Sequence, residues 1–151
     1  MLNVVLIEPE IPPNTGNIGR LCLAAGARLH LVGPLGFSLD DRALKRAGLD
    51  YWPEVDLVLW DSFGELRQSA EDDAGFFFLT TKSKRPYWDA TFSANDYLVF
   101  GSETRGVPRY LLVESEAQCL TIPQKSGRSL NLATSVGIVL YEAVRQLEFA
   151  G

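Results

Sequence analysis

Short, uninterrupted apolar runs alternate with amphipathic segments along most of the chain. Apolar runs that lack a polar alternation are typical of strands in a parallel sheet buried on both faces. Such runs predict strands at residues 2–7, 28–32, 55–60, 76–79, 97–100 and 119–122. Because the strands alternate with helical segments, the pattern predicts one α/β domain over residues 1–151. Its sheet is expected to be mostly parallel and covered by helices on both faces.

Capping residues and glycines mark the helices expected between these strands. Asn14 or Thr15 is expected to cap the first helix, which ends at Gly26, and the prolines of segment 8–13 exclude helix before it. Pro108 fits the first turn of a brief helix. Further helices are expected from Asp40 to Gly48, from Asp61–Ser62 to about Asp73, and from about Asn131 to Leu147.

The last of these helices is apolar on more than one side. One stripe at helical spacing comprises Val136, Val139, Leu140, Ala143 and Leu147. Ile138, Tyr141 and Val144 lie off that stripe and are also apolar or aromatic. A surface helix in a monomer needs only one apolar stripe, about 100° wide. We therefore expect a second copy of the chain to cover the other side, which makes the protein a homodimer.

The net charge of −5 is unevenly distributed. Residues 54–73 hold seven acidic residues against one basic residue, so the remainder of the chain sums to +1. Basic residues cluster at Arg42–Arg46, at Lys82–Arg85, and at Lys125 and Arg128. Each cluster alone is explained by a solvated face, and an anionic substrate remains compatible with them.

Several classes of protein are excluded by composition. No apolar stretch approaches the roughly 18 residues that span a membrane, and the first residues lack the basic start of a signal peptide, so we expect a cytoplasmic protein. The two cysteines, Cys22 and Cys119, suit small core residues. The only histidine, His30, lies among apolar neighbours and is expected to be structural. No cluster has metal-ligand spacing, so no metal is expected.

Four polar segments directly follow predicted strands, where open α/β sheets bind their ligands: 14–20, 79–82, 100–108 and 122–131. In the first segment, the glycine spacing is GxxG rather than GxGxxG, which argues against a dinucleotide site. The remaining explanation for Gly16 and Gly19 is close packing of the helix. Arg20 falls near the end of the expected first helical turn. A cation is unfavourable there, which indicates that it faces an anion.

The two later segments leave alternatives open. Gly101 and Gly106 bracket Glu103 and Arg105, which either form a local ion pair that stabilises a turn or belong to a site. Segment 122–131 ends in Asn131, a helix cap, but capping does not explain the density of polar groups before it. Such groups can recognise the edge of a base.

These segments resemble motifs of the SPOUT superfamily of S-adenosylmethionine-dependent RNA methyltransferases. Within it, they are most similar to the tRNA wobble-nucleotide (cytidine/uridine) ribose 2′-O-methyltransferases of the YibK-like branch. The motifs are EPEIPPNTGNIGRLC (8–22), LTTK (79–82), FGSETRGVP (100–108) and IPQKSGRSLNLATSVGIVLYEAVRQ (122–146). The loop before Arg128 is one residue shorter than the family pattern, and Gly127 stands where the family often has Asp. Residues 61–78 match poorly, which is expected to affect only a peripheral helix.

The resemblance implies a C-terminal trefoil knot, the SPOUT fold, with S-adenosyl-L-methionine bound in the knotted crevice and S-adenosyl-L-homocysteine as product. The cofactor-binding residues that it implies are Leu79, Gly101, Ile122 and Ser129, with Gln124 and Leu130 in support. It places Arg20 at the ribose hydroxyl, and Asn14 would position either Arg20 or the ribose. Glu103 and Arg105 would order the active-site loop, and Arg128 would line the site together with Ser129.

The resemblance also implies partners: the tRNA anticodon loop and a second subunit whose Arg20 completes the site. Two alternatives stay open, namely a nucleotide-binding module without catalysis and 2′-O-methylation of another RNA site. A dinucleotide-dependent oxidoreductase is disfavoured by the missing GxGxxG.

Overall fold

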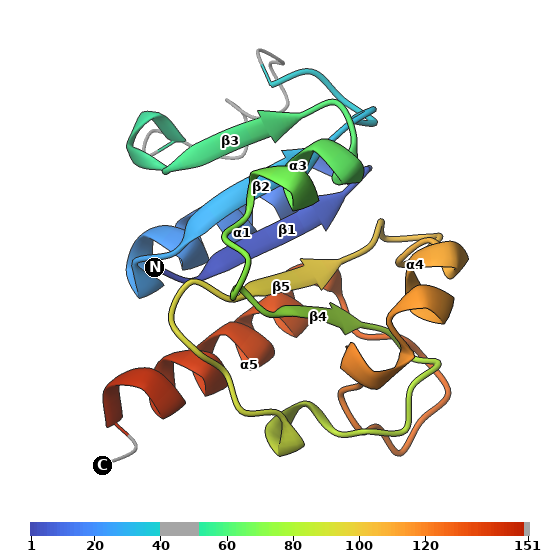
Figure 1. The fold of residues 1–151 in the computed structure, drawn as a ribbon. Helices are drawn as coiled ribbons and strands as arrows, with labels where there is room; N and C mark the ends of the chain where they lie inside the picture. Colours follow the sequence, from blue (N-terminus) through green and yellow to red (C-terminus); the bar gives the residue numbers. More distant parts are fainter. Residues whose placement is uncertain (40–51, 150–151) are drawn as a thin grey trace.

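Six parallel strands form one sheet in the computed structural model, which describes residues 1–39 and 52–149. The strand order is β3-β2-β1-β5-β4-β6, with β1 and β5 in the centre (Figure 1). Their bounds are β1 Asn3–Ile7, β2 Arg28–Val32, β3 Leu57–Trp60, β4 Phe76–Leu79, β5 Tyr97–Phe100 and β6 Cys119–Leu120. Each pairing of these strands is parallel. The expected parallel α/β sheet is confirmed.

Three strands are shorter than their apolar runs suggest: β1 by one residue, and β3 and β6 by two residues each. β3 begins only at Leu57 because Val55, directly after the short 3₁₀ turn η1 (Trp52–Glu54), donates its N–H back to Trp52 O at 3.1 Å. β6 ends at Leu120 because Thr121 turns its backbone to segment 85–87, donating to Arg85 O at 2.8 Å and accepting from Tyr87 N at 2.9 Å. Apolar content alone does not reveal such changes of backbone partner.

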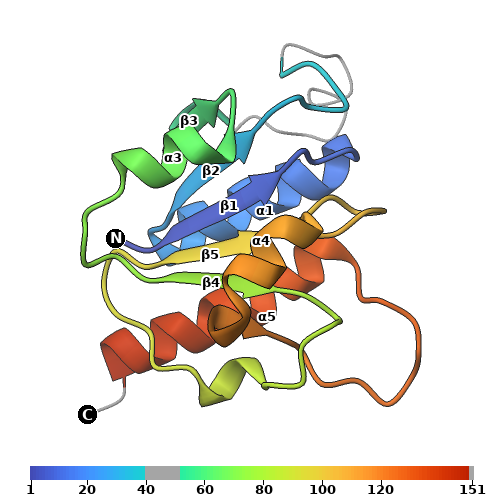
Figure 2. The ribbon, with the colours of Figure 1, turned by 45° about the vertical axis from the view of Figure 1, so that its right-hand side comes forward.

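Helices cover both faces of the sheet, as the sequence predicts. α1 (Pro12–Ala25) and α5 (Leu132–Val144) lie on one face, and α3 (Phe63–Ser69) and α4 (Arg109–Glu114) lie on the other (Figure 2). Ile18 of α1 and Val139 of α5 are fully buried in the first core. Leu66 of α3 and Leu111 of α4 are buried in the second.

α1 begins three or four residues earlier than predicted and is not capped by Asn14 or Thr15. Pro12 and Pro13 occupy its first positions, where no N–H is needed, so the prolines start the helix instead of preventing it. Gly26 ends α1 with φ 71°, as expected. Arg20 consequently lies more than two turns into the helix. The inference drawn from the dipole of the first turn is therefore wrong.

α3 is shorter than expected, and it is not peripheral. Ser62 caps it by accepting from Glu65 N at 3.2 Å, and the backbone becomes extended at Ala70 instead of continuing to Asp73. Phe63 is buried, and the Arg67 guanidinium lies 5.3 Å from the centre of its ring. On the same face, Pro108 is the N-cap of α4 and not part of its first turn.

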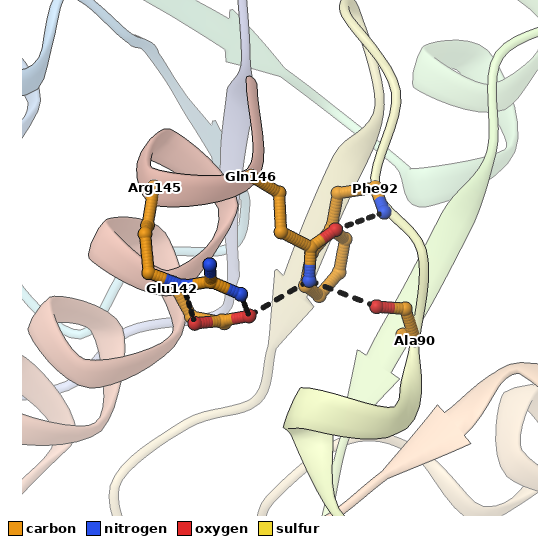
Figure 3. A network of polar contacts seen from close by, with 5 residues as sticks. All are labelled: Ala90, Phe92, Glu142, Arg145 and Gln146. Carbon is orange, nitrogen blue, oxygen red and sulfur yellow. Dashed lines mark hydrogen bonds and ion pairs between the residues drawn. The ribbon is translucent and has the colours of Figure 1, made fainter. Parts of the chain in front are cut away.

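α5 is capped by Asn131, as predicted, but its end differs. After Val144 the chain continues as the π-helical segment η4 (Arg145–Phe149). Gln146 accepts from Phe92 N at 2.8 Å and donates to Ala90 O at 3.0 Å, which fastens this end to the segment before β5 (Figure 3). The wider turn changes the register, so Leu147 is exposed although the predicted stripe included it, whereas Val144 is buried.

The predicted helix from Asp40 to Gly48 and the Arg42–Arg46 cluster lie outside the described residues. No helix in residues 1–39 and 52–149 is long and apolar enough to cross a membrane.

Candidate active site

A cavity of about 480 Å³ lies beyond the carboxyl ends of β4, β5 and β6 and is closed by the first turns of α1 and α5. This volume lies in the usual range of about 300–1,000 Å³ for small-molecule sites. All six residues expected to bind the cofactor line it: Leu79, Gly101, Ile122, Gln124, Ser129 and Leu130. The structure thus brings together residues up to 51 positions apart in the sequence, counting from 79 to 130.

One wall of the cavity is the wall loop, residues 101–107, which follows β5. Gly106 N donates to Ser102 O over 3.0 Å and closes the turn, and Gly106 adopts φ 70°. A Cβ on Gly101 would lie only 1.8 Å from the carbonyl carbon of Gly106. The chain therefore folds back on itself so closely that position 101 has no room for a side chain.

The two carboxylate–guanidinium partners expected within this loop do not pair with each other. Glu103 accepts from Glu10 N and Ile11 N, each at 2.8 Å, at the start of α1. Arg105 instead approaches Glu8, with 3.9 Å between Nη2 and Oε1. Of the two alternatives that the sequence left open, the local ion pair is excluded, because both side chains reach across to the segment before α1.

A chain of side-chain amides joins the first turns of α1 and α5 to the wall loop. Asn14 is buried, and its Nδ2 donates to Glu103 Oε2 at 3.2 Å. Its Oδ1 accepts from Asn131 Nδ2 at 3.1 Å, while Asn131 Oδ1 accepts from Thr134 N at 3.2 Å. Three motifs that are distant in the sequence therefore share one hydrogen-bonded network at the cavity edge.

Of the three arginines expected at the site, Arg105 lines the cavity of this chain, whereas Arg20 and Arg128 do not. Arg20 is exposed on α1, and Arg128 is exposed in the loop before α5, where its N–H donates to Ser126 Oγ at 3.1 Å. Of the Lys82–Arg85 cluster, Lys82 lines the cavity. Arg85 donates to Ala117 O at 3.0 Å and has a structural role there.

Sequence reasoning missed some of the polar lining. Asn131 was expected only as a helix cap, yet it also lines the cavity, as do Thr80 and Ser135. Their place directly after a strand or at a helix start was the available signal. No group of three or more potential metal ligands occurs among the residues that the structure describes.

The lining of the cavity is that of a small-molecule or cofactor site. Leu79, Phe100 and Ile122 give it apolar surface, and Gln124 and Ser129 add polar groups. Apolar walls with a few polar groups are typical of such sites.

The parallel sheet with its flanking helices matches the α/β structures of SpoU-class methyltransferases, and comparison with known proteins gives the family. Residues 1–141 match the SpoU rRNA Methylase family, to which the chain belongs. The chain is 49% identical over its whole length to the tRNA (cytidine(34)-2'-O)-methyltransferase of Yersinia pestis, covering 97% of that protein. It is 47% identical to the enzyme of the same name from Burkholderia ambifaria, covering 100% of this chain and 99% of the relative. The resemblance drawn from the motifs is confirmed.

Solved structures give the same result. A structure from work on the 2-OH methylation of C/U34 on tRNA superposes with a TM-score of 0.91 at 47% identity, covering 97% of this chain and 96% of the other. The SpoU methyltransferase AviRb from Streptomyces viridochromogenes, in complex with the cofactor AdoMet, has a TM-score of 0.84 at 27% identity. The match covers 97% of this chain and 58% of AviRb.

Proposed function

We propose that this chain methylates the ribose 2′-hydroxyl of the wobble nucleotide, cytidine or uridine, in the tRNA anticodon loop, using S-adenosyl-L-methionine and releasing S-adenosyl-L-homocysteine. The observation that carries the proposal is the convergence of the motif residues on one cavity, in a chain 49% identical to a tRNA (cytidine(34)-2'-O)-methyltransferase. The AdoMet complex of AviRb supports the cofactor.

In this proposal the cofactor is held by the cavity residues. Leu79 and Ile122 pack against it, Gly101 gives it the backbone of the wall loop, and Gln124, Ser129 and Leu130 contact it from the loop before α5. S-adenosyl-L-methionine, when bound, supplies an electrophilic methyl group on its sulfonium. The task left to the protein is to align the ribose oxygen with that methyl group and to exclude water.

Arg20 is the residue that we assign to the ribose hydroxyl. A guanidinium stays protonated near neutral pH, so Arg20 is not a general base. It can donate hydrogen bonds to the oxygen as negative charge develops there. Asn14 and Glu103 position α1 through the network at the cavity edge, and Arg128 contacts the RNA next to Ser129.

The assembly that this site requires is a homodimer. Arg20 does not line the cavity of its own chain, which supports a site completed by Arg20 of the partner subunit. The exposed apolar residues of α5 and η4, Tyr141, Leu147 and Phe149, support an interface there. The proposal also includes a single domain over residues 1–151 with a C-terminal trefoil knot. It further includes a cytoplasmic location, where tRNA is modified.

The test replaces Arg20 and measures cofactor binding and methyl transfer separately. Arg20→Ala should lower single-turnover methyl transfer to tRNA by about 100-fold or more, because a donor to the developing charge is lost. Cofactor affinity in calorimetric titration should stay unchanged. Arg28→Ala is the matched control, since Arg28 lies at the opposite end of the sheet, paired with Asp56 at 3.0 Å.

Normal turnover of Arg20→Ala would remove Arg20 from the mechanism. Cofactor binding without any transfer by the unmodified protein would favour the nucleotide-binding module. Ribose-methylation mapping of RNA from cells that lack the protein identifies the methylated position, and a loss outside the wobble nucleotide would favour another RNA site.

A further inference from the structure

The wall loop and the segment before α1 are joined by reciprocal hydrogen bonds, in which each segment contributes a carboxylate that accepts from the other. Glu103 of the wall loop accepts from Glu10 N and Ile11 N at 2.8 Å. In return, Glu10 Oε1 accepts from Thr104 Oγ1 at 2.7 Å and from Thr104 N at 3.1 Å. We call this set, Glu10, Ile11, Glu103 and Thr104, the reciprocal clasp. The hydrogen bonds from the Thr104 hydroxyl and N–H hold the pKa of Glu10 below its ordinary value.

The clasp caps the N-terminus of α1. Pro12 and Pro13 have no N–H, so the N–H groups of Glu10 and Ile11 are the donors that precede the first turn, and Glu103 accepts from both. This replaces the side-chain cap that α1 lacks. The entry angle of α1 is therefore set by a residue 92 or 93 positions later in the chain.

The other end of the clasp belongs to the cavity. Gly101, Ser102, Glu103 and Thr104 all line it, and the turn they form has no slack, because Gly101 packs on the backbone of Gly106. A ligand that presses on this wall can move it only by moving the clasp. Glu10 and Thr104 touch no expected reacting atom, yet they connect the cofactor wall to the helix that carries Asn14 and Arg20.

We propose that Glu10 and Thr104 are positioning residues that couple occupation of the cofactor cavity to the placement of α1. Cofactor binding orders the wall loop, the clasp transmits this order to the first turn of α1, and tRNA then binds a preorganised surface. The proposal rests on the proposed function. By linkage, cofactor and tRNA each strengthen the binding of the other by the same factor.

The experiment uses Thr104→Val, which removes the hydroxyl donor and keeps the size of the side chain and its N–H. Thr104→Ser restores the hydroxyl, and Thr91→Val, at an exposed position before β5, is the matched control. Calorimetry measures the affinity for S-adenosyl-L-homocysteine. The affinity for tRNA is measured with and without S-adenosyl-L-homocysteine. Amide hydrogen exchange is followed in residues 8–14. Melting temperatures confirm that each variant is folded.

In the unmodified protein, S-adenosyl-L-homocysteine should tighten tRNA binding by about fivefold or more and slow exchange of the Glu10 and Ile11 amides. In Thr104→Val this coupling factor should fall to about 1 and kcat by about tenfold, while the affinity for S-adenosyl-L-homocysteine changes by less than about threefold. Thr104→Ser should recover most of the coupling, and Thr91→Val all of it.

An unchanged coupling factor and unchanged amide protection in Thr104→Val would overturn the inference and leave the proposed function intact. A loss equal in Thr104→Val and Thr104→Ser would also overturn it, because the hydroxyl would then have no role. Absence of methyl transfer to tRNA by the unmodified protein is a different outcome, since it contradicts the proposed function itself.

Discussion

His30 is a buried imidazole held in its neutral form by its neighbours. Trp60 Nε1 donates to Nδ1 at 3.0 Å, and the opposite ring nitrogen, Nε2, lies 2.8 Å from Asn3 Oδ1, so Nε2 carries the proton. A second proton at Nδ1 would face the indole N–H. Burial, and to a lesser degree the charge of Arg28, lowers the pKa of His30 from 6.5 to about 4. The sequence-based interpretation of His30 as structural is confirmed.

This arrangement predicts a loss of stability in mild acid. The unfolded chain takes up the proton near pH 6.5 and the folded protein only near pH 4, so stability falls as the pH drops through that window. The free energy of unfolding should be about 2 kcal/mol lower at pH 5 than at pH 7. Urea denaturation at the two pH values measures it, and His30→Gln should abolish most of the difference. An equal dependence in His30→Gln would assign the effect to other groups.

At the scale of elements, the functional unit is the wall loop between β5 and α4. Its shape depends on contacts between backbone atoms, because Gly101 and Gly106 meet at distances that exclude a side chain. The strand before it is fully buried, so the loop cannot relieve a clash by shifting β5. The close contact between Gly101 and Gly106 therefore fixes the backbone at the base of the loop, and this part of the loop belongs to the cavity wall.

Gly101→Ala should consequently destabilise the protein by about 3 kcal/mol, since an inserted methyl forces the backbone apart. It should also weaken the binding of S-adenosyl-L-methionine by tenfold or more, on the order expected for a displaced wall. Gly127→Ala is the control: its Cβ would meet nothing within 4 Å, and its stability should change by less than about 0.5 kcal/mol. Thermal denaturation and calorimetric titration measure the two effects. Normal binding by a fully stable Gly101→Ala would show that the wall is not rigid.

At the scale of the whole molecule, one face of the last helix packs on the sheet and another carries exposed apolar side chains. Tyr141 is 44% exposed and Phe149 is 74% exposed. Val144, in contrast, belongs to the core. The prediction that Val144 lies on the side covered by a second copy is therefore wrong, and a charge there would unfold the chain. Tyr141 is the position that reports on assembly.

Tyr141→Asp should dissociate the homodimer and lower methyl transfer together, because the site is expected to need Arg20 of the partner subunit. A buried charge at an interface centre weakens association by about 2 kcal/mol or more. Tyr110→Asp is the control, because Tyr110 lies on the opposite face of the sheet and its side chain is 60% exposed. This variant should leave the mass of the protein in solution unchanged. Light scattering measures the mass. An active, unmutated protein near 16.7 kDa would contradict the homodimer.

The sequence by itself determined the strands, the class of fold and the segments of the site. Buried parallel strands need uninterrupted apolar runs, so β2, β4 and β5 have the bounds that their runs predict. Ligands bind beyond strand ends in such sheets, so the polar segments after β4 and β5 could be chosen before their geometry was known. The motifs in those segments carried the resemblance to the family.

Only the tertiary structure decided which side chains and backbone groups of distant segments pair with each other. Glu103 and Arg105 are neighbours in the sequence, and their charges suggest a local pair. The carboxylate of Glu103 instead accepts from the N–H groups of Glu10 and Ile11, directly before the two prolines that start α1. Such partners are brought together by the strand order, in which β5 lies beside β1. Local periodicity contains no information on that order, because it describes the faces of an element and not its neighbours.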